Sequence, residues 1–178
     1  MPNRKTTQSS SVPYLVDTCV FVHAFCDKAN GSSEIVEASR QLFTRAEAGD
    51  IRVFVSAVTI AEILAINYLR SDDPRGPGTR KQRNVERKKL KAWLAGRTTT
   101  VEVDESLALA AGDVGHQHKF KGADAIIYAS AIEAGVDALI TTDKGLLKAN
   151  TPTLPVLLPT DIGGQTIISI GASETTLS

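Results

Sequence analysis

Short apolar runs alternate along the chain with longer segments in which apolar residues recur at helical spacing. The runs are rich in Val, Ile, Leu and Thr, and each is bounded by polar or turn-forming residues. We therefore predict five strands, at Val12–Val16, Ile51–Val55, Thr98–Val103, Ala138–Thr141 and Thr153–Leu158.

The segments between these strands predict helices. Ser33 is the expected N-cap of one helix, which Gly49 ends, and Asp104 is the expected N-cap of another. The remaining predicted helices are Thr18–Phe25, Ala57–Arg70, Gln82–Leu94 and Ala123–Ala134. Strands that alternate with helices of this length need crossover connections, and these produce parallel pairing. The expected fold is a three-layer α/β/α sandwich with a mainly parallel central sheet.

The length of 178 residues fits one such domain. We expect it to span residues 12–160, after a disordered polar tail at 1–11. Two prolines and two glycines mark a loop at 71–79, and residues 161–178 hold a further strand, Gln165–Ile170, of uncertain role. No apolar run is long enough to span a membrane, so no membrane contact is expected.

Two carboxylates directly follow predicted strands. Asp17 comes after Val12–Val16, and Asp143 comes after Ala138–Thr141. Ligand crevices in open parallel sheets form at the carboxyl ends of the strands, so both side chains would face one crevice if the strands are neighbours. Taken singly, each residue is more simply explained as a turn or cap aspartate.

Two further acids interrupt apolar helices. Glu62 is the only charge between Ala57 and Ile66, where it shares a predicted face with Val58. A buried glutamate needs a partner, so Glu62 is a ligand, a salt-bridged residue or a residue at the wet edge of the helix. Asp124 heads an alanine-rich helix, where it is either an N-cap or a residue of the crevice.

Together the four acids suggest one anionic pocket. Like charges repel, so such a cluster persists only if a cation or shared protons offset it. Carboxylates without an accompanying Cys or His set favour Mg²⁺ or Mn²⁺ over zinc.

At this point the sequence resembles the PIN-domain nucleases. Four segments look like the acidic motifs of that family, in its order: VPYLVDTCV, AVTIAEILA, GADAIIYASA and DALITTDKG. The resemblance spans about Val12 to Pro159 and implies a PIN-like fold. It implies that the catalytic, metal-binding acids are Asp17, Glu62, Asp124 and Asp143. The family's hydroxyl beside the last acid falls on Thr141, and Thr18 is the second hydroxyl expected to support the acids.

The resemblance also implies an activity and its partners. PIN nucleases hydrolyse RNA phosphodiester bonds, and a compact chain of this size is similar to the VapC-type ribonuclease toxins of toxin–antitoxin pairs. We therefore expect Mg²⁺ or Mn²⁺ as cofactor, RNA as substrate, a cognate antitoxin protein and a homodimer. One departure is Cys19, because many relatives have Asn or Ser there to help orient the metal-binding side chains.

A local basic segment lies in a chain whose overall charge is balanced. Lys plus Arg and Asp plus Glu each number 20, which excludes a wholly basic nucleic-acid coat. Between Arg70 and Lys91, however, the sequence contains nine basic residues and only three acidic ones. Such runs are usually solvated helix faces, but beside an acidic pocket this one favours RNA contact. The expected contacts are Arg80, Lys81, Arg83, Arg87, Lys88 and Lys89.

Other polar and aromatic residues carry weaker signals. Cys19 and Cys26 form no disulfide framework, so they are expected to be small core residues in a reducing cytoplasm. His116 and His118 do not share a helix face and are expected at the surface. Trp93 and Tyr68 are expected to anchor helices.

Alternative functions fit the sequence less well. A haloacid-dehalogenase-like phosphatase needs Asp-x-Asp after the first strand, where this chain has Asp17-Thr18-Cys19. A PIN-like RNA-processing nuclease that is not a toxin, and a catalytically inactive RNA- or protein-binding module, both remain open.

Overall fold

The computed structural model describes residues 11–26, 31–66 and 79–163. Its strands are β1 (Val12–Val16), β2 (Ile51–Ser56), β3 (Thr98–Val101), β4 (Ala138–Ile140) and β5 (Val156–Leu157). They form one sheet in the order β3-β2-β1-β4-β5, and all four pairings are parallel. The predicted parallel sandwich is confirmed, and β1 lies at the centre of the sheet.

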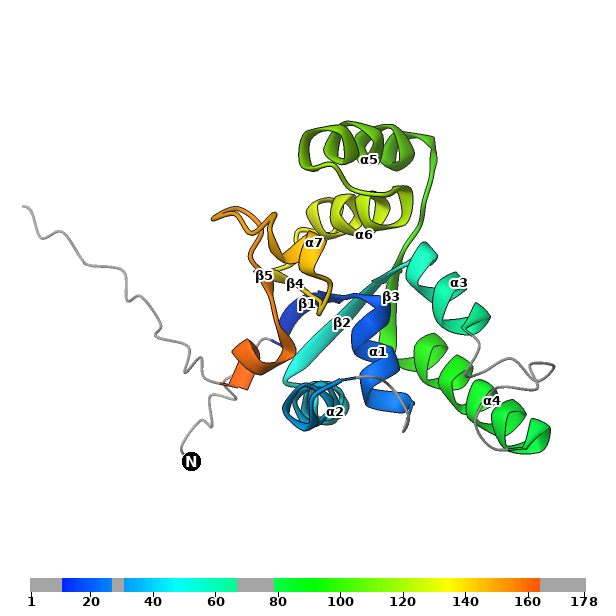
Figure 1. Ribbon diagram of the computed structural model, residues 1–178. Helices are drawn as coiled ribbons and strands as arrows, with labels where there is room; N and C mark the ends of the chain where they lie inside the picture. The colour runs from blue at the N-terminus through cyan, green and yellow to red at the C-terminus, as the bar shows by residue number, and fades with distance from the viewer. Residues whose placement is uncertain (1–10, 27–30, 67–78, 164–178) are drawn as a thin grey trace, which may run out of the picture.

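The helices between the strands follow the predicted periodicity. They are α1 (Thr18–Phe25), α2 (Ser33–Ala48), α3 (Ala57–Ala65), α4 (Arg80–Arg97), α5 (Glu105–His118), α6 (Gly122–Glu133) and α7 (Lys144–Leu147), followed by the 3-10 helix η2 (Pro159–Gly163). Figure 1 shows α5, α6 and α7 on one side of the sheet and α1 and α2 on the other. No helix of the described segments is long and apolar enough to cross a membrane.

Several helix ends differ from the sequence prediction. The N-cap of α2 is Ser32, whose Oγ accepts from Ile35 N at 3.3 Å, so the expected cap Ser33 is wrong by one residue. Asp104 does cap α5, and Gly49 does end α2 with a positive φ of 88°. The predicted tail at 1–11, except its last residue, most of the loop at 71–79, the strand Gln165–Ile170 and Tyr68 lie outside the described residues.

Two apolar layers enclose the sheet. On one face, β1 and β2 pack against α1, α2 and α4, where the rings of Phe21, Phe25, Phe43 and Trp93 contact one another at centroid distances of 4.7–6.2 Å. Trp93 also donates from Nε1 to Glu47 Oε1 at 3.0 Å, so it anchors α4 as predicted.

On the opposite face, α6 and α7 cover β1 and β4, and α5 packs outside α6. Small residues permit this close stacking, since Ala125, Ala129 and Ala131 of α6 are all buried. A hydrogen bond inside the core, from Ser130 Oγ to Ser56 Oγ at 3.1 Å, joins α6 to β2. The packing of α6 on β1 and β4 thus brings the start of α6 near the residue that follows β4.

Candidate functional site

Asp17 lies at the carboxyl end of the central strand. Its backbone N–H donates to Ile140 O at 3.0 Å, which extends the pairing of β1 with β4 by one residue. The chain then turns into α1, and the side chain of Asp17 caps that helix. Only 5% of the residue is exposed. Because β1 and β4 are neighbours, the acids that follow them share one edge, as the sequence predicted.

Three donors hold the Asp17 carboxylate. Oδ1 accepts from Thr18 N at 2.6 Å, and Oδ2 accepts from Thr141 Oγ1 at 2.6 Å and from Cys19 Sγ at 3.1 Å. Burial nevertheless raises the pKa of Asp17, and the nearby charge of Glu62 raises it further, although the three hydrogen bonds oppose both effects. The three hydrogen bonds thus orient a carboxylate whose charged form is disfavoured by burial.

Glu62 reaches the same place from α3. Its Oε2 accepts a hydrogen bond from Thr18 Oγ1 at 2.5 Å. The buried residues of α3 are Thr59 and Ile63, so the apolar face predicted through Val58 and Glu62 is wrong by one position. Glu62 is half-buried at the edge of that face, where Thr18 links it to Asp17. Of the sequence-based interpretations, the wet-edge position describes its burial.

Asp143 follows β4 and opens a helix that the sequence analysis missed. Its Oδ1 accepts from Gly145 N at 2.6 Å and from Leu146 N at 3.0 Å, which caps the single turn α7. Its own N–H donates to Thr141 Oγ1 at 2.9 Å. Thr141 therefore binds both Asp17 and Asp143. The interpretation of Asp143 as a cap aspartate is therefore confirmed, and Gly145 suits the cap because a Cβ there would lie only 2.8 Å from Asp143 Oδ1.

Asp124 lies in the first turn of α6 but does not cap it. The N-cap is Lys121, which makes no side-chain capping bond, so the interpretation of Asp124 as an N-cap is wrong. Burial raises the pKa of Asp124, and the charges of Asp143 and Glu62 raise it further, while Lys121 lowers it. These electrostatic contacts join Asp124 to the acids that follow β4 and lie on α3.

Cys19 belongs to the same network and is not merely a small core residue, which corrects the prediction. Besides its contact with Asp17, its Sγ accepts from Thr142 N at 3.1 Å and lies 3.4 Å from Thr141 Oγ1. Burial, followed by the charge of Asp17, raises the pKa of the thiol to about 12. The thiol therefore keeps its proton at neutral pH and can donate it.

The four acids provide the donor atoms that a hard divalent cation prefers, since Mg²⁺ and Mn²⁺ bind carboxylate oxygens. Among the described residues, no three His, Cys, Asp or Glu side chains lie close enough together to hold a metal ion as they stand. Three of the four carboxylates accept hydrogen bonds: Asp17 from three donors, Glu62 from Thr18, and Asp143 from the start of α7. The donor chemistry of the four acids fits a divalent cation.

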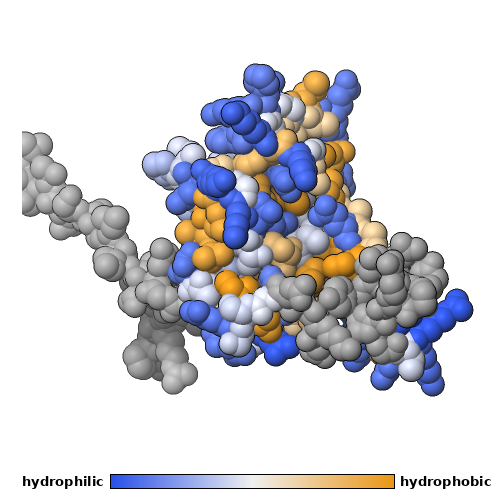
Figure 2. Space-filling view, viewed as in Figure 1, coloured by the Kyte–Doolittle hydropathy of each residue, from blue (hydrophilic) through white to orange (hydrophobic). Residues whose placement is uncertain are grey.

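The basic segment forms α4, which begins with a capping box between Thr79 and Gln82. Figure 2 shows hydrophilic side chains gathered at the lower right, where α4 lies in Figure 1. Arg83 departs from the predicted set of RNA contacts because it is only 8% exposed. The other predicted contacts are exposed: Arg80, Lys81, Arg87, Lys88 and Lys89. A hollow of about 490 Å³ lies along this face, beside Asn84 and Val85.

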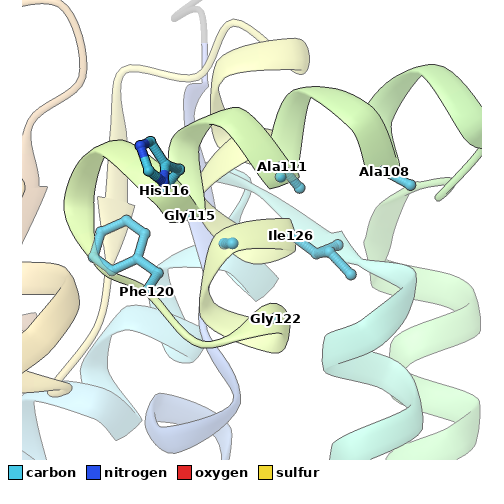
Figure 3. Close-up of a pocket in the computed structure, with 9 residues that line it drawn as sticks. Ala108, Ala111, Gly115, His116, Phe120, Gly122 and Ile126 are labelled. Carbon is cyan, nitrogen blue, oxygen red and sulfur yellow. The ribbon is translucent and has the colours of Figure 1, made fainter.

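A groove between α5 and α6 escaped the sequence analysis. It has a volume of about 440 Å³, and Figure 3 shows small side chains and Ile126 along it, with His116 and Phe120 at one end. His116 is exposed as predicted, whereas His118 is half-buried and stacks on Phe120 with a centroid distance of 5.3 Å. The recurrence of Ala and Gly at helical spacing in α5 was the signal for close packing, but not for a hollow.

Comparison with known families decides the classification. The PIN domain family matches residues 14–151, which include all four acids. The chain belongs to the PIN domain family. No curated protein matches the chain in sequence.

Solved structures show the same fold at low sequence identity. The PIN domain is similar to a chain in the crystal structure of VapBC2 from Rickettsia felis bound to a DNA fragment from their promoter, with a TM-score of 0.52, 16% identity, and coverage of 83% of this chain and 98% of that one. It is also similar to a chain of a toxin–antitoxin complex from Klebsiella pneumoniae, with a TM-score of 0.55, 19% identity and coverage of 82% and 97%. For PAE2754 from Pyrobaculum aerophilum the TM-score is 0.54, the identity 18% and the coverage 85% and 92%.

Proposed function

We propose that this PIN domain is a metal-dependent endoribonuclease that hydrolyses RNA phosphodiester bonds. The observation that carries the proposal is the buried Asp17 carboxylate, held by three donors beside further acids. The raised pKa values of Asp17 and Asp124 have burial and neighbouring carboxylates as their causes, which supports a single electrostatic cluster. Perturbed carboxylates gathered at one sheet edge are typical of a functional site.

The proposed cofactor is Mg²⁺ or Mn²⁺, with Asp17, Glu62, Asp124 and Asp143 as its ligands. When bound, such an ion activates water and offsets charge on the scissile phosphate. The chain's own residues orient the acids: Thr141 donates to Asp17, and Thr18 donates to both Asp17 and Glu62. A cation would also offset the repulsion that raises the pKa of Asp124.

The proposed substrate binds through α4 as well as the acids. An anionic pocket repels phosphates, so RNA needs cationic contacts nearby. The exposed residues Arg80, Lys81 and Lys88 line the hollow along α4, and Arg87 donates to Leu64 O of α3 at 3.4 Å. Since α3 also carries Glu62, the basic helix is joined to an element of the acidic cluster.

The proposed partner is a cognate antitoxin, in a cytoplasmic toxin–antitoxin pair in which this chain is a homodimer. The structures from R. felis and K. pneumoniae are described as VapBC2 and as a toxin–antitoxin complex, which supports the same assignment here. An inhibitor of this site would present Arg or Lys to the carboxylates, because complementary charge is needed to enter an anionic pocket.

Cleavage of RNA by the purified protein tests the proposal. We expect cleavage with Mg²⁺ or Mn²⁺, none with EDTA, and at least a hundredfold loss in Asp17→Asn, the scale on which removal of a transition-state contact acts. The control Asp113→Asn changes an exposed acid of α5 and should cleave normally.

Two outcomes would redirect the proposal. Cleavage that survives Asp17→Asn would exclude these acids as the active site. Expression of the active protein that leaves cell growth unaffected would favour an RNA-processing nuclease over a toxin, and RNA binding without cleavage would favour an inactive binding module.

A further inference from the structure

Asp17 and Asp143 lie on different elements, and two links across one short turn set their relative position. The first link is Thr141, whose Oγ1 donates to Asp17 and accepts from Asp143 N. The second link is Cys19, whose Sγ contacts Asp17 Oδ2 at 3.1 Å and accepts from Thr142 N at 3.1 Å. Each side chain thus bridges the start of α1 and the turn between β4 and α7.

The hydroxyl hydrogen of Thr141 and the thiol hydrogen of Cys19 can each be assigned to one acceptor. Thr141 has a single hydroxyl hydrogen, which goes to Asp17 Oδ2, so its oxygen is left to accept from Asp143 N. Cys19 has a single thiol hydrogen, and Asp17 Oδ2 is the nearest acceptor for it. The Cys19 sulfur is then the acceptor for the Thr142 amide.

A third contact holds the same turn. His23 lies four residues after Cys19, on the same face of α1, and its Nε2 is 3.3 Å from Thr142 Oγ1. Both α1 side chains therefore contact Thr142, Cys19 at the backbone amide and His23 at the hydroxyl. His23 is buried, with 9% of its surface exposed. The turn after β4 is therefore contacted by a side chain that is itself packed in the interior.

We propose that Cys19 is a positioning residue, which orients the Asp17 carboxylate through its S–H and fixes the Thr141–Asp143 turn through its sulfur. It acts through Asp17 and touches no reacting atom. This role rests on the proposed function, in which Asp17 and Asp143 bind the same cation. Residues that orient metal ligands in this way typically contribute 10- to 100-fold to metal affinity.

Direct binding of Mn²⁺, measured by titration calorimetry without RNA, tests the role. In Cys19→Ala we expect affinity to fall by about 10- to 100-fold, with the unfolding transition retained. Cys19→Ser restores a donor and an acceptor and should recover most of the loss. The matched control is Cys26→Ser, which alters the C-cap at the other end of α1 and should bind Mn²⁺ like the wild type. Unchanged affinity in Cys19→Ala would overturn the proposal.

The S–H stretching band gives a readout that does not depend on metal or activity. Cys19 and Cys26 are the two cysteines of the chain, so Cys26→Ser leaves Cys19 as the single thiol. Donation to a carboxylate should lower its band relative to the same thiol in the unfolded chain. A band at the unfolded position would overturn the proposal even if Cys19→Ala fails to fold. A lowered band in a protein that binds no Mn²⁺ would refute the metal-dependent function while supporting the orientation of Asp17 by Cys19.

Discussion

At the scale of single residues, the candidate site consists of carboxylates whose charges oppose folding. Asp17 is buried, and Asp124 lies close enough to Asp143 and Glu62 for their charges to raise its pKa. Such an arrangement lowers stability in exchange for a concentrated negative potential. Removing one charge should therefore stabilise the fold.

Asp124→Asn tests this view through the pH dependence of stability. The pKa of Asp124 is raised above 3.8 in the folded chain, so the folded state binds more protons than the unfolded state as the pH rises from 3.8 through the folded pKa. The wild type loses stability across that window, and the variant escapes the loss. We expect a gain of about 0.5 kcal/mol at neutral pH, since solvent screens a half-buried group, and none below pH 3.8.

Urea unfolding at several pH values measures the difference. Asp113→Asn, which changes an exposed acid, provides the control. Its free energy of unfolding, plotted against pH, should run parallel to that of the wild type. A gain that is the same at acidic and neutral pH would show that charge is not its cause.

The sequence could identify these residues but not their contacts. Asp17 and Asp143 were predictable because each directly follows an apolar run that pairs in a parallel sheet. The resemblance marked position 19 as one where relatives carry an orienting side chain, but the contacts of the Cys19 thiol were not predictable, because they form only when Thr142 is brought beside it. Such contacts join residues more than a hundred positions apart and depend on the packing of α1 against the end of β4.

At the scale of elements, periodicity located the strands and long helices but misjudged their ends. Local capping decides those ends, as with Ser32 and Asp143, and the single turn α7 is too short for a periodic pattern. The buried face of α3 was also misjudged by one position, because Thr59 packs inward while Glu62 lies at the edge. Interior packing thus overrides a count of apolar residues.

The close approach of α5 to α6 depends on Gly115. A Cβ at this position would lie 3.2 Å from Ala125 Cβ, closer than ordinary packing permits. Gly115→Val should therefore separate the two helices and cost about 1–3 kcal/mol in the free energy of unfolding. Gly112 also lines the groove, but a Cβ added there would meet no atom within 4 Å, so Gly112→Ala should stabilise α5 by up to about 1 kcal/mol.

Chemical denaturation of both variants checks the contrast. Equal changes in the two proteins would show that α5 adapts freely and that its glycines matter only through helix propensity.

At the scale of the whole molecule, charge is balanced overall but divided by region. The four candidate acids gather at the carboxyl edge of the sheet, whereas α4 carries a run of exposed cations. This division would let one surface hold phosphates while the other holds a cation. It was visible in the sequence as a basic run in a neutral chain, but the burial of Arg83 was not.

Lys88→Glu tests whether α4 binds RNA. If Lys88 contacts a phosphate, affinity for unrelated single-stranded RNAs should fall, and the slope of log affinity against log salt should lessen by roughly 0.7. The matched reversal Arg52→Glu lies near the start of β2, at the edge away from the acids, and should leave the slope unchanged. Fluorescence anisotropy over a salt series measures both. Equal salt slopes in the wild type, Lys88→Glu and Arg52→Glu would indicate that Lys88 contacts no phosphate and that this face of α4 is only solvated.

The aromatic cluster beneath α4 contains an intrinsic fluorophore that can report on the position of this helix. Trp93 is the single tryptophan of the chain, and it is held between Phe43, at a centroid distance of 5.0 Å, and the carboxylate of Glu47. Its emission therefore reports on the seating of one helix, without any attached dye. A red shift would reveal α4 lifting from the body of the protein, and an unchanged spectrum during RNA binding would mean that the helix receives its ligand without moving.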